Sequence, residues 1–190
     1  MKKIFVLTII ALFAFGANLI YADPIIDKIE AAGKKHTKIT GAFTETRLDK
    51  NGTAKSSKQG TLTYTAADRK FEMAYSQPKG DLFVIAGDQM SINKGGKTQK
   101  FNLVKNAPMR ALSGILVGSI SGQINQMAKD NEVTIATATT GQYYVVTMPA
   151  KKKTARGYST IVLSYDKAKM YLKKMQMTEW SGQSTLYEME

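Results

Sequence analysis

The stretch RKFEMAYSQPKGDLFVIAGDQMSIN, residues 69–93, decides how the rest of the chain is interpreted. Phe71, Met73 and Tyr75 stand at alternate positions, which is the period of a β-strand with one apolar face. The alternation stops at Gln77-Pro78, and an apolar run resumes at residues 82–85. The pattern predicts two antiparallel strands joined by a polar turn. It leaves open whether the face of Phe, Met and Tyr is solid core or the wall of a cavity.

The same strand signals recur on both sides of this stretch. Runs rich in β-branched and aromatic residues alternate with short polar turns, which is typical of an all-antiparallel meander. Because there is no repeat and no linker, we predict one domain with a mainly β (α+β) fold, a barrel or a strongly curved sheet. The eleven expected strands are residues 39–48, 58–65, 70–76, 82–86, 89–93, 98–103, 132–139, 142–148, 158–165, 171–180 and 183–188.

Two segments have helical rather than strand periodicity. Residues 23–38 predict a short amphipathic helix that begins near Pro24. Residues 108–130 place one apolar side chain every three or four positions, which predicts one helix or two short ones. Glycines 114, 118 and 122 recur on a different stripe. Each glycine in a helix interior makes the helix about 1 kcal/mol less stable than alanine would. This segment is therefore expected to be broken or to be held by close packing.

The N-terminus is typical of a secretory signal peptide. Lys2 and Lys3 precede an apolar run from Ile4 to Phe15, and cleavage is expected after Ala22. The run is shorter than the roughly 20 residues of a spanning helix, which argues against an uncleaved anchor. We therefore predict that residues 1–22 are removed and that residues 23–190 form a single exported domain.

The chain is strongly basic, with 27 Lys and Arg residues against 15 Asp and Glu, a formal charge of +12. Such a balance favours acidic partners, such as anionic lipid headgroups or an acidic protein surface. Export argues against nucleic acid. The lysines are spread along the whole chain, so solvated strand faces and loops are the better explanation of them.

Catalytic and metal-binding patterns are absent from the sequence. There is no cysteine, and His36 is the only histidine, which excludes Cys/His catalysis and multi-histidine metal sites. Gly96-Lys97-Thr98 lacks the upstream glycine of a phosphate-binding loop, and residues 118–122 have Ile where a nucleophile elbow has Ser. We predict a protein that is not an enzyme and that uses no metal or cofactor.

A set of short motifs occurs in a characteristic order along most of the chain. They are Gly41–Thr46, Gly60–Tyr64, the FEMAYSQP segment Phe71–Pro78, Ile85–Asp88, Tyr143–Pro149, Met175–Gly182 and Thr185–Tyr187. In these motifs the chain resembles the LolA family, periplasmic carriers that shuttle lipoproteins from the inner to the outer membrane.

The resemblance implies an unclosed antiparallel β-barrel whose concave apolar face is covered by a helical lid. The acyl chains of a lipoprotein would occupy the cavity between sheet and lid. In many relatives an Arg-Pro pair before the signature Phe helps to hold the lid shut; here Asp68 and Arg69 stand at that place, and Arg69 is the candidate latch. The implied cavity residues are Phe43, Leu62, Tyr64, Phe71, Met73, Tyr75 and Val84, and the implied lid residues are Leu112, Leu116, Ile120 and Ile124.

The resemblance also implies partners and a location. We expect a periplasmic monomer that receives lipoproteins from an inner-membrane lipoprotein-releasing transporter and passes them to an outer-membrane acceptor. An alternative is a non-carrier sensor or receptor with the same fold that binds a lipid or a lipoprotein. A third possibility is a hydrolase whose site the sequence does not reveal.

Overall fold

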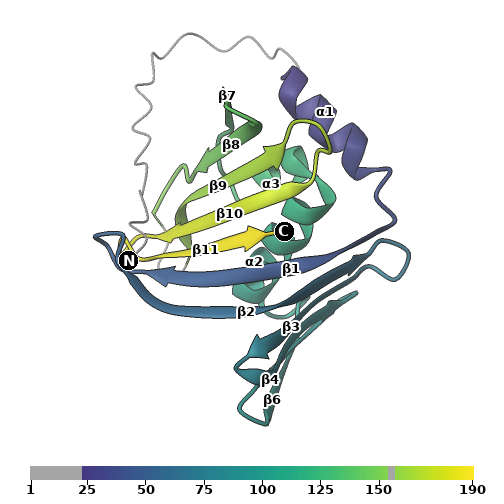
Figure 1. Ribbon diagram of the computed structural model, residues 1–190, viewed down its shortest axis with the longest axis vertical. Coiled ribbons are helices and arrows are strands. Elements are labelled where there is room, and N and C mark those ends of the chain that lie inside the picture. Colours follow the sequence, from purple (N-terminus) through teal and green to yellow (C-terminus); the bar gives the residue numbers. More distant parts are fainter. Residues whose placement is uncertain (1–22, 154–156) are drawn as a thin grey trace.

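The computed structural model describes residues 23–153 and 157–190. The predicted signal peptide, residues 1–22, lies outside the described residues. Eleven strands and three helices make up the fold (Figure 1). The strands are β1 (Lys38–Leu48), β2 (Ala54–Thr65), β3 (Lys70–Gln77), β4 (Lys79–Ala86), β5 (Gln89–Lys94), β6 (Lys97–Asn102), β7 (Ala136–Thr140), β8 (Tyr143–Pro149), β9 (Tyr158–Asp166), β10 (Leu172–Glu179) and β11 (Ser184–Met189). The helices are α1 (Pro24–Gly33), α2 (Ala107–Ser121) and α3 (Ile124–Asp130).

All eleven strands belong to one antiparallel sheet. Its order is β6-β5-β4-β3-β2-β1-β11-β10-β9-β8-β7, so two meanders meet where β1 pairs with β11. The edge strands β6 and β7 have no pairing with each other, and the sheet is not closed into a barrel. The predicted mainly β fold with an unclosed sheet and helices is confirmed.

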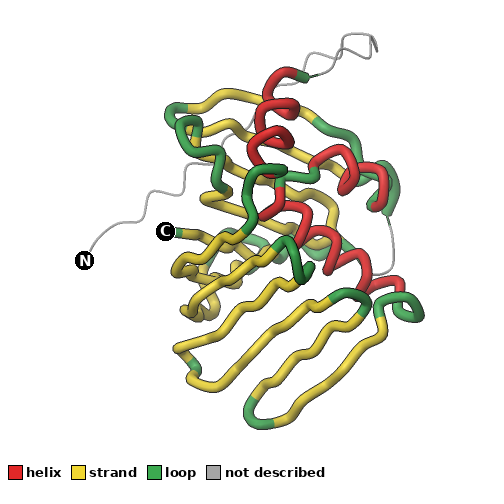
Figure 2. Tube along the Cα trace, turned by 90° about the vertical axis from the view of Figure 1, so that its right-hand side faces the viewer, coloured by secondary structure: helices red, strands yellow, loops and turns green. Residues whose placement is uncertain are grey.

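The helices lie together against one side of the curved sheet (Figure 2). α2 and α3 form the connection between the two edge strands, β6 and β7. One core cluster joins apolar side chains of all three helices to those of the sheet, for example Ile29 of α1, Ile120 of α2 and Leu163 of β9. We call α2 and α3 the lid helices, since they cover the concave face.

The boundaries of several elements differ from those predicted. β2 begins at Ala54 rather than at residue 58, and β4 begins at Lys79 rather than at residue 82. α1 ends at Gly33 rather than Lys38, because Gly33 packs directly on the backbone of Ser121 at the end of α2. The strand expected from residue 132 begins only at Ala136. Glu132 has a left-handed backbone, with φ 51°, and Val133 makes a single bridge to Ala150, so the chain turns here before it joins the sheet.

The glycines of the lid explain how its helices fit together. α2 ends at Ser121 and is capped by Gly122, whose φ of +72° stops the helix and whose absent side chain leaves room for the carbonyl of Ile29 on α1. A side chain at Gly118 would overlap Met127 of α3, whereas the space beside Gly114 is empty. The expectation of a broken segment with a close-packed glycine face is confirmed at two of the three glycines.

This difference predicts opposite effects of one substitution at two positions, one turn apart. Gly114→Ala removes a flexible residue without a clash and should raise the free energy of unfolding by about 0.5–1 kcal/mol. Gly118→Ala must displace the buried Met127 and should lower it by about 1–3 kcal/mol. Urea denaturation of both variants measures the difference. Equal effects at the two positions would contradict this account of the lid.

Candidate ligand-binding cavities between helix and sheet

The register of β1, β2 and β3 decides which side chains share the concave face. Residues paired directly across two strands lie on the same face. Gly60 pairs with both Phe43 and Tyr75, Leu62 pairs with Met73, and Tyr64 pairs with Phe71. The structure therefore brings six of the seven predicted cavity residues together on one face: Phe43, Leu62, Tyr64, Phe71, Met73 and Tyr75.

Val84 is on the other face, which corrects its predicted place in the cavity. It pairs with Glu72 on β3, whereas Phe83 pairs with Met73 and Ile85 pairs with Phe71. The inward side chains of β4 are therefore Phe83 and Ile85. Residues 82–85 are all apolar, so their sequence has no alternation from which the inward face could be identified.

The predicted lid residues all face the sheet. Leu116, Ile120 and Ile124 are buried in the core cluster, and Leu112 packs against it while remaining partly exposed. Leu112, nearest the N-terminal end of the lid, is the most exposed of the four.

The two ends of α2 are held to different extents. At the C-terminal end, the buried Tyr165 hydroxyl of β9 donates a hydrogen bond of 2.7 Å to the carbonyl of Ser119. This satisfies a carbonyl in the last turn that has no partner within the helix. At the N-terminal end, Asn106 caps the helix, and Pro108 and Ala111 are exposed. α2 is therefore fixed to the sheet at one end and reaches solvent at the other.

Three cavities lie beside the lid helices. The large cavity, of about 680 Å³, is within the roughly 300–1,000 Å³ of small-molecule sites. The tyrosine cavity, of about 180 Å³, and the Arg69 cavity, of about 170 Å³, are smaller. The apolar groups that line the large cavity include Met109, Leu112, Ile115, Val133, Ile161 and Trp180. The residues that line the tyrosine cavity include Arg47, Met73, Tyr75, Leu112, Leu116, Tyr158, Glu179 and Tyr187. The residues that line the Arg69 cavity include Arg69, Ile85, Gly114, Gly118, Gln126 and Asp130.

The predicted cavity residues divide into two groups. Met73 and Tyr75 line the tyrosine cavity. The other four inward residues, Phe43, Leu62, Tyr64 and Phe71, line none of the three cavities and are part of the core. Sequence reasoning missed the larger space, which lies beside β9 and β10. The inward alternation of residues 159–165 and the single Trp, at position 180, were the available signals.

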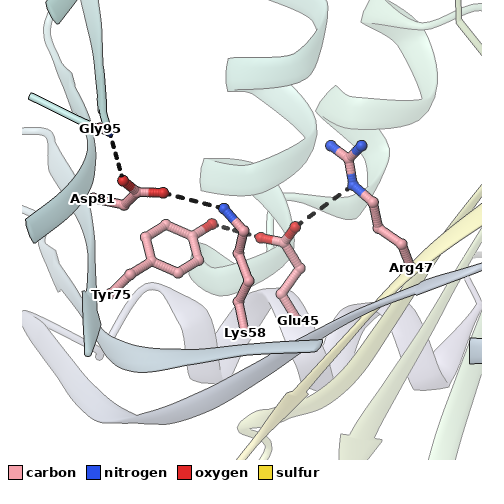
Figure 3. A network of polar contacts seen from close by, with 6 residues as sticks. All are labelled: Glu45, Arg47, Lys58, Tyr75, Asp81 and Gly95. Carbon is pink, nitrogen blue, oxygen red and sulfur yellow. Dashed lines mark hydrogen bonds and ion pairs between the residues drawn. The ribbon is translucent and has the colours of Figure 1, made fainter. Parts of the chain in front are cut away.

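A polar network lies on the concave face next to the tyrosine cavity (Figure 3). Tyr75 donates a 2.5 Å hydrogen bond from its hydroxyl to Oε2 of Glu45, which is only 6% exposed. Arg47 places Nε 3.9 Å from Oε1 of the same carboxylate. Burial, together with the nearby Tyr187 and Glu45, raises the pKa of Tyr75. The Tyr75 phenol therefore stays protonated and continues to donate to Glu45 over the physiological pH range.

The network continues through Lys58, the direct cross-strand partner of Glu45. Lys58 lies 4.9 Å from the centre of the Tyr75 ring and 3.2 Å from a carboxylate oxygen of Asp81. Asp81 also accepts a hydrogen bond from the backbone N–H of Gly95, and this bond and Lys58 lower the pKa of its carboxyl. The sequence alone could have placed Glu45 on the inner face, because it stands two positions after Phe43 in β1.

Neither a metal cluster nor a spanning helix is found in the described ranges. Residues 23–153 and 157–190 contain no group of three His, Asp or Glu side chains placed to hold a metal ion. None of the three helices described has the length and apolar character needed to cross a membrane.

A profile of the family described as "Outer membrane lipoprotein carrier protein LolA" matches residues 34–190. The chain belongs to the LolA family. The match includes every strand of the sheet and both lid helices, but not the predicted signal peptide or α1. No curated protein sequence matches the chain.

Solved structures with a similar fold come from several bacteria. A LolA superfamily protein, NE2245 from Nitrosomonas europaea, has 8% sequence identity and a TM-score of 0.40, with 87% of this chain and 90% of that chain covered. The Mycobacterium tuberculosis lipoprotein LppX has 10% identity and a TM-score of 0.43, with 87% and 91% covered. The Pseudomonas aeruginosa MucA/MucB complex has 12% identity and a TM-score of 0.48, with 87% and 54% covered.

The division between core and cavity predicts the outcome of a charge substitution in this LolA-family chain. Phe71 is 1% exposed and packs edge-on against Phe83, so Phe71→Glu should lower the free energy of unfolding by several kcal/mol or prevent folding. Val84→Glu, on the outer face of the next strand, should lower the free energy of unfolding by about 1 kcal/mol or less. Thermal melting of both variants tests this. A Phe71→Glu protein with an unchanged melting temperature would show that solvent reaches this position.

Proposed function

We propose that this LolA-family protein is a periplasmic carrier that binds the acyl chains of lipoproteins and shuttles them from the inner to the outer membrane. The observation that carries the proposal is the large apolar-lined cavity of about 680 Å³ beneath α2. Binding and release, without a chemical conversion, is the function that such a cavity supports. Residues 1–22 would direct export and be removed.

Release of the cargo places a limit on how firmly the lid is held. Each buried methylene contributes about 0.8 kcal/mol to binding, so a long acyl chain is bound strongly. Such a chain can be released only if opening the lid costs little free energy. Two features of α2 favour easy opening at its N-terminal end: the exposed Pro108 and Ala111 at the cavity mouth, and the unpacked Gly114. The Tyr165–Ser119 hydrogen bond would keep the other end in place.

Arg69 is proposed as the latch of the lid. It lies in the turn between β2 and β3 and lines a cavity together with Gln126 and Asp130 of α3. A positive charge that lines the same cavity as Asp130 supports a closed lid.

The proposed partners follow from this function. An inner-membrane lipoprotein-releasing transporter would load the carrier, and an outer-membrane acceptor would unload it. The formal charge of +12 for the whole chain, less the two lysines of residues 1–22, suits docking to acidic protein surfaces. We propose that the carrier acts as a monomer, since a single chain contains both the cavity and its lid.

The cargo itself is the direct test. We expect native mass spectrometry of the mature protein, purified from its host, to detect a bound triacylated lipoprotein. Recovery of a free lipid or of a signalling protein in its place would favour the sensor or receptor alternative and overturn the carrier proposal.

A substitution at the cavity mouth tests where the acyl chain lies. Ala111→Trp places a bulky side chain at the exposed opening of the large cavity and should reduce binding of a palmitoylated peptide about tenfold or more. Its melting temperature should change little, because Ala111 is exposed. The matched control is Ala31→Trp, at an exposed position on α1, which should bind normally. Normal binding by Ala111→Trp would place the acyl chain elsewhere.

Removal of the latch should loosen α3. We choose Arg69→Asn, because Arg69 has a left-handed φ of 45° that asparagine tolerates. Amide hydrogens of α3 should exchange faster by about fivefold, which corresponds to the loss of roughly 1 kcal/mol of attraction between Arg69 and the lid. Lys100→Asn, on the exposed edge strand β6, removes the same charge and should leave the exchange of α3 unchanged. Equal exchange in both variants would remove Arg69 from the lid mechanism.

A further inference from the structure

The large cavity and the tyrosine cavity are neighbours with opposite character. Leu112, Tyr158 and Glu179 line both of them, so the two spaces adjoin at these side chains. The large cavity is mostly apolar, although Asp130, Glu132 and Lys152 also line it, whereas polar groups make up most of the lining of the tyrosine cavity. An apolar space that leads into a polar one fits a ligand with an apolar chain and a polar head.

The tyrosine cavity offers hydroxyl groups from three different strands. Tyr75 of β3, Tyr158 of β9 and Tyr187 of β11 all line it. Burial raises the pKa of Tyr187, with Glu45 adding to the effect, and burial and Glu179 raise the pKa of Tyr158. Both phenols therefore remain hydrogen-bond donors at any physiological pH. The Tyr75 hydroxyl already donates to Glu45, which fixes its orientation beside the cavity (Figure 3).

Among the described residues, the charges around these hydroxyls leave no positive excess. Arg47 faces the buried carboxylate of Glu45, and Lys58 is paired with Asp81. Glu179 adds a further negative charge at the junction of the two cavities. Because both cations have carboxylate partners and Glu179 has none among the ion pairs of the described residues, an anionic headgroup would meet a net negative surrounding.

We propose that the tyrosine cavity binds the neutral, carbonyl-bearing head of an acylated ligand, an amide or an ester, while the acyl chain lies in the large cavity. The hydroxyls of Tyr158 and Tyr187 and the guanidinium of Arg47 donate to the carbonyl oxygen. Glu45 is a positioning residue, since it orients Tyr75 and offsets the charge of Arg47. The inference rests on the proposed function and adds to it a selection for linked acyl chains over free fatty acids.

The test compares two ligands with the same chain and different heads, palmitamide and palmitate. Displacement of a fluorescent acyl probe at pH 7.5 should show palmitamide binding to the wild type about tenfold more tightly than ionised palmitate. Glu45→Gln keeps an oxygen that can accept from Tyr75 but removes the negative charge. It should tighten palmitate binding and reduce the amide preference about fivefold or more.

The control is Glu188→Gln, the same change on the outer face of β11, where Glu188 pairs with Lys174. It should leave the ratio of the palmitamide and palmitate affinities unchanged. A general effect of net charge would change this ratio in the control as well. If Glu45→Gln does not fold, Glu179→Gln takes its place, because Glu179 is exposed and lines both cavities. Tyr187→Phe should weaken palmitamide binding about fivefold, the loss of one hydrogen bond.

The outcomes separate this inference from the proposed function. Tight binding of both ligands with equal affinity, or a ratio that Glu45→Gln does not change, overturns the neutral-head site and leaves the acyl carrier in place. If neither ligand binds to the wild type, the acyl cavity and the carrier function fail together.

Discussion

An open sheet with one apolar face must cover that face, and this constraint organises the whole molecule. In a closed barrel the strands surround their own core, but here β6 and β7 are unpaired with each other and the concave face is left open. The chain between these two edge strands forms α2 and α3, which turn back over the face. Burial of Leu116, Ile120 and Ile124 holds them there. The cover is thus attached by side-chain packing, with few polar contacts to the sheet.

This form of attachment explains how a lid can be stable and still open. Packing is tight where Gly118 and Gly122 allow α3 and α1 to approach α2, and the Tyr165 hydroxyl adds a directional contact at the same end. It is loose toward the N-terminal end of α2, where the large cavity takes the place of core side chains. A gradient of packing along one helix gives a fixed end and a free end without a separate hinge.

The sequence predicted the strands well because most of them alternate and are separated by turn residues. It also predicted which of the residues 71–75 face inward. It failed at Val84, because a uniformly apolar run has no period that identifies its inward face. It also failed at residues 132–135, because the left-handed turn at Glu132 is set by the end of α3. The large cavity was not predicted because an empty space depends on how far α2 stands from β9 and β10, and no local pattern records that distance. Glu45 was missed although its alternation with Phe43 was visible, since a lone carboxylate in a strand is usually solvated.

The strand that begins at Phe71 belongs to both the core and a cavity. Phe71 is enclosed by Tyr64, Phe83 and Ile85 and supports the sheet, whereas Tyr75, four residues later, lines a cavity and joins a polar network. Met73 stands between them, and its flexible side chain suits a boundary at which packing changes. If a protein binds apolar groups on the inner face of its own sheet, its packed core can cover only part of the length of each strand. The core ends at the hydroxyl and carboxylate groups near Tyr75. The polar end of a bound ligand would lie there, because it needs hydrogen-bonding partners.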